Sequence, residues 1–325
     1  MKNIIIIILT LILLFGCSKS TTSSQEKYLS QEEIDAIEEA YNIIKATADS
    51  ILLSENPYEG YQNIMSDYAQ IQEVIDIYLD STALYIDMEF YISYIWVFND
   101  NSFPDKSEFI MEESDKEEFY YENSRNQDII GNSDGRIINA IYFDELLENT
   151  NNSIIPEMRT TMNSFGLETE IIDSEAGLNF FKTKLNDYGV IIYYGHGIYD
   201  ENKDLVYIQT ADEGNTQFQL SETDRKLTVR GTFPAMISGV LKDVNYLFIT
   251  EEFIDHYYNS FPNSLIFFQS CQLLDTRSNL SSILLGKGVG NVWGWTRKAY
   301  IFTDHLCHNL MRYMLMGPHC SDAYT

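Results

Sequence analysis

Basic residues are scarce in this 325-residue chain, which has 21 Lys and Arg against 49 Asp and Glu and a formal net charge of -28. So large a negative charge is repelled by the phosphates of nucleic acids and by anionic lipid surfaces, so we expect no nucleic-acid partner. Hydrophobic residues make up 45% and aromatic residues 14% of the chain. This composition is enough to bury a substantial core and excludes a largely disordered protein.

Long hydrophobic runs are also missing, with one exception at the start of the chain. Lys2 precedes an apolar run from Ile4 to Phe15 that is interrupted only by Thr10. The run is shorter than the roughly 20 apolar residues of a transmembrane helix, and it is typical of a secretory signal peptide. It ends in Leu14-Phe15-Gly16-Cys17, which resembles the lipobox of bacterial lipoproteins, in which the cysteine carries the lipid.

The lipobox resemblance implies a protein exported to the bacterial cell envelope and held at a membrane by a lipid anchor on Cys17. Residues 1–17 then form the signal peptide with its lipobox cysteine, and residues 18–29 form a flexible tether. Cysteine is otherwise rare, and the remaining Cys271, Cys307 and Cys320 are odd in number. At least one exported thiol is therefore unpaired, and it is either buried as a small apolar group or reactive.

Residues 30–135 predict an α-helical hairpin followed by a small β module. Ser30-x-x-Glu33 is a capping box that marks the start of the first helix, and a second, antiparallel helix is expected to reach Tyr78. Strict alternation of apolar and polar residues from Leu84 to Ile92 predicts one half-buried strand. Residues 99–135 are polar and acidic, as in a solvated linker, and we expect the region to be a structural or interaction module.

Residues 136–325 predict an α/β domain, because strand and helix patterns alternate along them. Two strand candidates, Val190 to Tyr194 and Leu265 to Phe268, are apolar without interruption. Such continuous apolarity indicates burial on both faces, as in a mostly parallel sheet flanked by helices. Between the two candidates, Leu205 to Ile249 predicts turns and short strands, and a last helix is expected over Asp304 to Met316.

The ends of the two apolar strands are the expected place for chemistry, because ligands of parallel sheets bind beyond the carboxyl ends of the strands. One strand runs into Gly195-His196-Gly197 and the other into Gln269-Ser270-Cys271. If the strands are neighbours, an imidazole lies beside a thiol and can activate it as a nucleophile. The backbone amides of Gly197 and Cys271 are then candidates for an oxyanion hole.

This pair of motifs resembles the caspase-like cysteine peptidases, a group that includes clostripain, gingipain and the CHAT domains. Residues 278–295, with a helix, a Lys-Gly turn and a strand ending in Gly294-Trp295, are also similar to the CHAT and gingipain pattern. The resemblance covers residues 136 to about 316 and implies a caspase-like fold. The resemblance also implies that Cys271 is the nucleophile, that His196 is the general base or proton donor, and that Gly197 is an oxyanion donor.

The resemblance further implies a membrane-anchored cysteine endopeptidase that acts on peptides or proteins and requires no cofactor. Gln269, Ser270 and Trp295 are candidate substrate-pocket residues, with core packing as the alternative for Trp295. The alternative function is that of a catalytically inactive caspase-like scaffold or binding protein of the envelope. His305 and His308 lie three residues apart, but the regular spacing of a zinc site is missing, so no metal site is expected.

Overall fold

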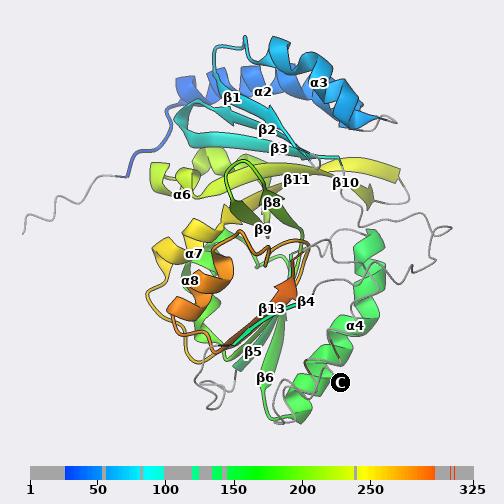
Figure 1. The fold of residues 1–325 in the computed structure, drawn as a ribbon, viewed down its shortest axis with the longest axis vertical. Coiled ribbons are helices and arrows are strands. Elements are labelled where there is room, and N and C mark those ends of the chain that lie inside the picture. The colour runs from blue at the N-terminus through cyan, green and yellow to red at the C-terminus, as the bar shows by residue number, and fades with distance from the viewer. Residues whose placement is uncertain are drawn as a thin grey trace, which may run out of the picture.

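A computed structural model describes residues 26–52, 56–80, 83–98, 119–123, 134–140, 145–237, 240–296, 308 and 311. Two β-sheets lie one above the other in Figure 1, and the N-terminal helical hairpin lies at the top of that view, above the upper sheet. The α/β class expected from the sequence is confirmed. Cys17 lies outside the described residues, as does the helix expected over residues 304–316 apart from His308 and Met311.

The lower sheet in Figure 1 has six strands in the order β4-β13-β12-β7-β5-β6. All neighbouring pairs are parallel except β13 and β4, so the sheet is mostly parallel, as expected. Its strands are β4 (Phe119–Asn123), β5 (Asp134–Asn139), β6 (Glu168–Ile172), β7 (Val190–Tyr194), β12 (Leu265–Gln269) and β13 (Asn291–Trp295).

Both faces of this parallel sheet are buried, which explains the uninterrupted apolar strands. In β7, Ile191 and Tyr193 join one core cluster, whereas Val190, Ile192 and Tyr194 join another on the opposite face. Alternate residues of a strand point to opposite faces, so each face needs its own helical cover. The first face is covered by α5 (Leu178–Thr183), α7 (Glu251–Tyr257) and α8 (Leu280–Gly286), and the second by α4 (Glu145–Ser164).

The upper sheet has seven strands in the order β1-β2-β3-β10-β11-β9-β8, and only the pair of β3 and β10 is parallel. The Tyr78 hydroxyl of one edge strand donates a hydrogen bond to Asp200 of the other at 2.7 Å, so the sheet is curled until its edges meet. The strands are β1 (Val74–Leu79), β2 (Ala83–Met88), β3 (Ile92–Val97), β8 (Gly197–Asp200), β9 (Leu205–Glu213), β10 (Thr228–Ile237) and β11 (Val240–Thr250).

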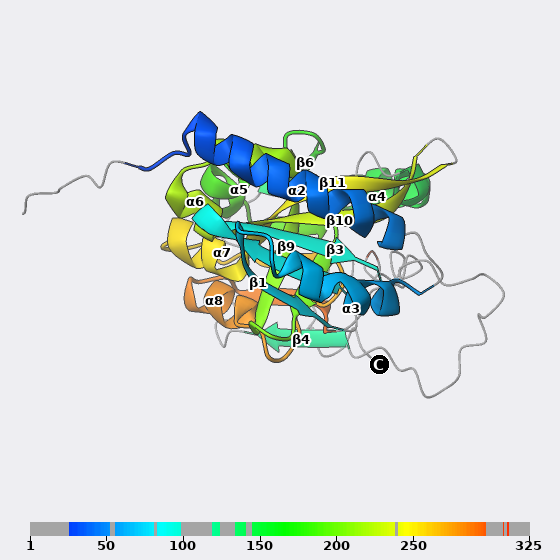
Figure 2. The same ribbon diagram turned by 90° about the horizontal axis from the view of Figure 1, so that it is seen from above.

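The predicted helical hairpin is confirmed as α2 (Gln31–Leu52) and α3 (Pro57–Tyr68), which lie side by side over β1, β2 and β3 (Figure 2). The Tyr61 hydroxyl of α3 donates to the Ala48 carbonyl of α2, and that of Tyr68 donates to Ile44. The later residue of α3 thus contacts the earlier residue of α2, so the two helices are antiparallel.

Three local predictions are wrong. The second helix ends at Tyr68 and not at Tyr78, because residues 74–79 form β1 and pair with β2. The single strand expected from Leu84 to Ile92 is interrupted by a 3₁₀ turn at Glu89–Tyr91, in which Phe90 has a φ of 58°. Part of the expected acidic linker, residues 119–123, forms β4 and pairs with β13.

The segment from Leu205 to Ile249 is also not the set of turns and short strands that was expected. It contributes β9, β10 and β11, and β10 and β11 pair along their whole length from Thr228 and Ile249 to Ile237 and Val240. β10 then pairs with β3 of the N-terminal region, so the small β module and this insertion build one sheet together. Local periodicity could not show this, because the pairing joins segments more than a hundred residues apart in sequence.

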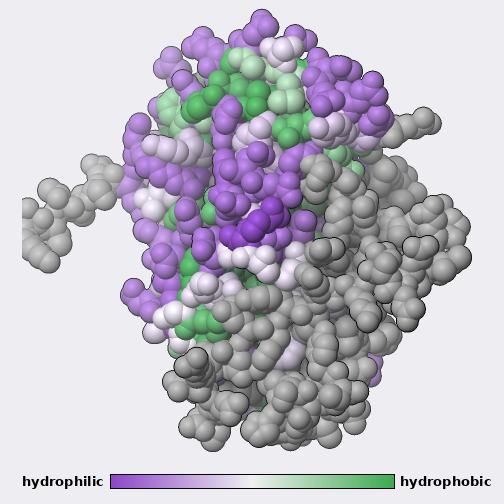
Figure 3. Space-filling model, viewed as in Figure 1, coloured by the Kyte–Doolittle hydropathy of each residue, from purple (hydrophilic) through white to green (hydrophobic). Residues whose placement is uncertain are grey.

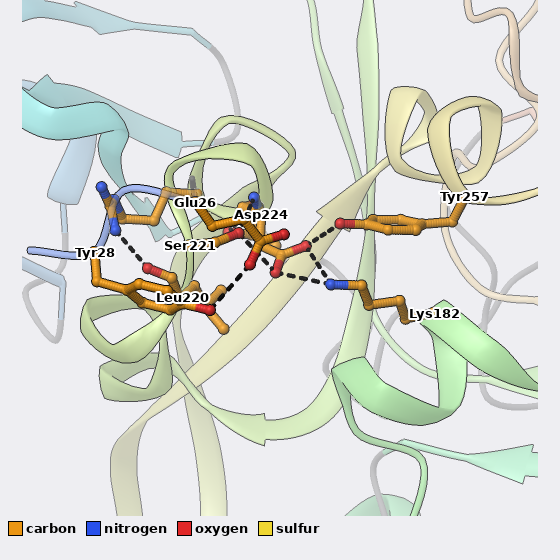
Figure 4. A network of polar contacts seen from close by, with 9 residues as sticks. Glu26, Tyr28, Lys182, Leu220, Ser221, Asp224 and Tyr257 are labelled. Carbon is orange, nitrogen blue, oxygen red and sulfur yellow. Dashed lines mark hydrogen bonds and ion pairs between the residues drawn. The ribbon is translucent and has the colours of Figure 1, made fainter. Parts of the chain in front are cut away.

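Helix α6 (Glu222–Lys226) fastens the two layers and the N-terminal segment to one another (Figure 4). Asp224 is buried, and its carboxylate accepts hydrogen bonds from Lys182 of α5 at 3.0 and 3.1 Å and from Tyr257 of α7. The next residue, Arg225, donates to main-chain carbonyls, including that of Phe90 at 3.0 Å. The Lys27 carbonyl accepts from the Glu222 amide at 2.8 Å, so the end of the expected tether is docked.

Figure 3 shows a face that is mostly hydrophilic where its residues are described, with hydrophobic residues gathered near the top, over the helical hairpin and β1. Among residues 26–296 that the structure describes, no helix is long and apolar enough to cross a membrane.

Candidate active site

The two strands that carry the predicted site residues are neighbours. β7 and β12 pair in parallel from Val190 opposite Leu265 to Tyr194 opposite Gln269. The segments that follow, Gly195-His196-Gly197 and Ser270-Cys271, therefore leave the same edge of the sheet at the same level. The sequence predicted that His196 and Cys271 lie close together if these two strands are neighbours, and the strands are neighbours.

Gly197 brings the two segments into direct contact. A Cβ atom added to Gly197 would lie 2.2 Å from the Cys271 carbonyl oxygen, 2.6 Å from Ser270 Oγ and 2.7 Å from a methyl group of Leu273. A side chain at this position would therefore push the two strand ends apart. Gly195 is equally constrained, because its added Cβ would lie 2.0 Å from the hydroxyl of Tyr193.

The imidazole of His196 lies where the two sheets join. β7 belongs to the parallel sheet, and β8, which begins at Gly197, is an edge strand of the curled sheet. His196 is 8% exposed, and its ring stacks on Phe233 of β10, with ring centroids 4.3 Å apart and an interplanar angle of 18°. Tyr246 of β11 lies beside it at 6.0 Å. The curled sheet thus supplies an aromatic wall for the ring.

The main chain of His196 is held from the neighbouring strand β9. The His196 amide donates to Gln209 Oε1 at 2.7 Å, and the His196 carbonyl accepts from the Gln209 amide at 3.2 Å. The hydroxyl of Tyr193 also donates to that carbonyl at 3.3 Å and to the Gln209 carbonyl at 2.8 Å. Burial raises the pKa of Tyr193 well above its ordinary value, so this hydroxyl stays a donor at neutral pH.

Cys271 carries a thiol, is partly exposed, and begins a turn with unusual backbone geometry. The next residue, Gln272, has a φ of 56°, in the left-handed region that costs a non-glycine residue about 1 kcal/mol. Such conformations cluster at functional sites. The turn is held at its far end, where the Leu274 amide donates to the Trp295 carbonyl at 3.1 Å.

A buried carboxylate anchors the chain beyond this turn. Glu251, the first residue of α7, is 1% exposed and accepts the Asn279 amide on both oxygens, at 3.1 and 3.2 Å. Burial raises the pKa of Glu251, and the bonds from Asn279 oppose that effect. The segment that follows Cys271 is thus fixed at both ends. Asn279 is also the N-cap residue of α8.

The three candidate pocket residues differ in their surroundings. Trp295 is 1% exposed and its Nε1 donates to Oε1 of the buried Gln269 at 3.1 Å, which is the arrangement of a packed pair. Ser270 is 3% exposed, and its Oγ faces Gly197 across the gap between the two strand ends. Ser270 is thereby in contact with the His-Gly segment.

The histidines near the C-terminus give no second site in the described residues. His308 Nε2 lies 2.8 Å from Thr161 Oγ1, and its Nδ1 lies 3.7 Å from a carboxylate oxygen of Glu157. His305 lies outside the described residues. No group of three or more His, Cys, Asp and Glu that could hold a metal ion occurs within the described ranges.

Gln209 and Phe233 contact His196 but were not predicted from the sequence. Gln209 is the first polar residue after the apolar run Val206-Tyr207-Ile208, a pattern that favours a buried, hydrogen-bonded amide. No comparable signal points to Phe233, because its contact with His196 depends on the curl of the sheet.

Comparison of the chain with protein-family models, curated proteins and solved structures found no match.

Proposed function

We propose that this chain is a cysteine endopeptidase in which Cys271 is the nucleophile and His196 its base. The observation that carries the proposal is the contact between the two strand ends, where Gly197 lies against Ser270 and the Cys271 carbonyl. A thiol is about 1% ionised two pH units below its ordinary pKa of about 8.5, so a neighbouring imidazole has a large effect on its reactivity at neutral pH.

The proposed reaction has two steps that share one covalent intermediate. His196 takes the proton of the Cys271 thiol, and the sulfur attacks the peptide carbonyl carbon. The carbon–nitrogen bond then breaks, and His196 gives that proton to the leaving amine. Water, deprotonated by His196, then cleaves the thioester and restores the thiol. The Gly197 amide is the proposed donor to the oxyanion, a role that is typically worth about 3 kcal/mol.

The proposed place of action is the bacterial cell envelope, with a lipid on Cys17 as the membrane anchor and a peptide or protein as the substrate. The proposal is supported by the apolar run and the Leu14-Phe15-Gly16-Cys17 sequence. The first described residue, Glu26, is nine residues beyond Cys17, and a fully extended segment of that length spans about 30 Å. An anchored protein would therefore remain close to the lipid surface.

The second candidate function is that of an inactive scaffold or binding protein on the same fold. It is favoured by the burial of His196, which is 8% exposed and whose ring stacks on Phe233. A catalytic imidazole must reach both the thiol and the leaving group of the substrate, and it does so more easily when exposed. The partial exposure of Cys271 favours the peptidase.

The rate at which iodoacetamide alkylates Cys271 in the full-length chain distinguishes the two functions. Peptide mapping measures this rate at Cys271 itself. We compare wild type with His196→Ala, Cys271→Ala and the control His256→Ala, which removes a histidine of α7 from outside the site. The peptidase predicts that His196→Ala slows alkylation of Cys271 at pH 6.5 by about tenfold or more. His256→Ala should leave it unchanged.

Equal alkylation rates of Cys271 in wild type and His196→Ala would show that the imidazole does not activate the thiol. The peptidase proposal would then be abandoned in favour of the scaffold. A rate that depends on His196 justifies the next measurement, which is cleavage of a peptide library by wild type and Cys271→Ala.

A further inference from the structure

The strand order of the parallel sheet reverses between β5 and β7. The chain passes from β5 to β6 on one side, and β7 then lies on the other side of β5. In open α/β sheets the ligand site lies outside the carboxyl ends of the strands at such a reversal. Here those ends are Asn139-Ala140, where β5 ends, and Gly195-His196, directly after β7.

The side chain of Gln209 connects the ends of these two strands. Its Nε2 donates to the Ala140 carbonyl at 2.9 Å, and its Oε1 accepts from the His196 amide at 2.7 Å. The Ala140 amide in turn donates to the Tyr194 carbonyl at 2.8 Å, so the ends of β5 and β7 are joined both directly and through Gln209. Gln209 comes from β9 of the curled sheet, and its amide thus links the two sheets at the site.

The amide of Gln209 is fully buried and is satisfied by these two bonds. An amide is removed from water at a cost unless it finds partners, so its presence beside β7 is explained by what it holds in place. The bond to His196 restrains the peptide that carries the imidazole, while Phe233 restrains the ring by stacking. Displacements of about 1 Å in such a residue change rates strongly.

We infer that Gln209 is the positioning residue of the His196–Cys271 site. It acts through His196 and not on the substrate, because both of its side-chain bonds go to the main chain at the ends of β5 and β7. The inference rests on the proposed function, since it concerns the effect of His196 on the thiol. It adds to that function the residue that keeps the imidazole in place.

The test uses Gln209→Met in the full-length chain, a change that keeps the length of the side chain and removes both hydrogen bonds. The matched control is Gln217→Met, because Gln217 is 1% exposed and its Nε2 also donates to a main-chain carbonyl, that of Thr228, at 2.9 Å. The rate of iodoacetamide alkylation of Cys271 is measured from pH 5.5 to 9.5, together with the thermal unfolding midpoint of each variant.

Gln209→Met is expected to slow alkylation of Cys271 at pH 6.5 by about tenfold and to move the inflection of the profile toward about 8.5, the ordinary thiol pKa. Gln217→Met is expected to lower the unfolding midpoint by a similar amount and to keep the wild-type profile. Gln209→Glu is expected to keep that profile too, because a buried, protonated carboxyl group can bond both His196 and Ala140.

Three outcomes would overturn the inference. A wild-type profile in Gln209→Met, alongside an altered one in His196→Ala, would overturn it alone and leave the proposed function standing. An equal shift of the profile in Gln217→Met would mean that general destabilisation is the cause. An ordinary thiol profile in wild type, unchanged in His196→Ala, would overturn the proposed function and this inference together. If Gln209→Met does not fold, the pH profile of Cys271 alkylation is measured in Gln209→Glu instead. A profile in Gln209→Glu that differs from wild type would overturn the inference.

Discussion

The closest contact in the candidate site is tested by Gly197→Ala. The added methyl group would lie 2.2 Å from the Cys271 carbonyl oxygen and 2.6 Å from Ser270 Oγ, whereas ordinary contacts begin at 3.4 Å. The two strand ends must therefore move apart by more than 1 Å. The nearest obstacle is a main-chain oxygen, which cannot rotate away as the end of a flexible side chain can.

The size of the effect follows from two opposing contributions. Overpacking of this kind typically costs about 1–3 kcal/mol, and the rigid obstacle places Gly197→Ala near the upper value. Replacing glycine also restricts the unfolded chain, which returns roughly 0.5–1 kcal/mol. We therefore expect the free energy of unfolding to fall by about 2 kcal/mol. If His196 activates Cys271 as proposed, alkylation of Cys271 at neutral pH should also slow, because the two strand ends that carry these residues move apart.

The assay is urea denaturation of the full-length chain, followed by fluorescence. The control is Gly286→Ala, the last residue of α8, where an added Cβ would meet nothing within 4 Å. That variant is expected to be more stable than wild type by roughly 0.5 kcal/mol, since alanine is the better helix former. A Gly197→Ala protein within about 0.5 kcal/mol of wild type would refute the close approach of the two strand ends.

Two further predictions concern charged residues away from the site. Burial, with a smaller contribution from the carboxylate of Asp49, raises the pKa of Asp243 to about 6. The contribution of Asp243 to stability is therefore present below about pH 4 and is lost as the pH rises through 6. In urea denaturation at pH 7, Asp243→Asn should be more stable than wild type by about 1 kcal/mol, and it should lack this pH dependence. Asp224→Ala should lower the free energy of unfolding by about 3 kcal/mol, because Lys182 and Tyr257 lose their shared acceptor (Figure 4).

Each of these two predictions has a control and a contrary result. Glu222→Ala removes an exposed partner of Lys226 and should change stability by less than about 0.5 kcal/mol. If Asp224→Ala costs no more than Glu222→Ala, the network around α6 does not fasten the layers. If Asp243→Asn keeps the wild-type slope of stability against pH between 4 and 6, another group is responsible for that slope.

Local features of the chain were predictable wherever neighbours in sequence determine them. The capping box is present, with the Ser30 amide donating to Glu33 Oε2 at 2.7 Å and the Glu33 amide donating to Ser30 Oγ at 3.3 Å. The strand β7 has the predicted bounds, Val190–Tyr194. A capping box and an apolar strand involve only a few consecutive residues, so they can be recognised without knowledge of the rest of the chain.

Failures occurred where a distant partner decides the conformation. Residues Val74–Leu79 have apolar positions compatible with a helix, but they form a strand because β2 offers its unpaired edge. The long strands β10 and β11 were missed because their core is assembled from the N-terminal region as well as from β8 and β9. Pairing over such separations leaves no periodic signal in either segment.

The sequence by itself determined the two chemical groups of the candidate site, because His196 and Cys271 each follow an uninterrupted apolar strand. The tertiary structure decided that these strands are neighbours, and it brought Gln209 and Phe233 to His196 from a different sheet. The physical reason is that strand identity depends on local burial, whereas strand order and curl depend on how distant segments share hydrogen bonds and core.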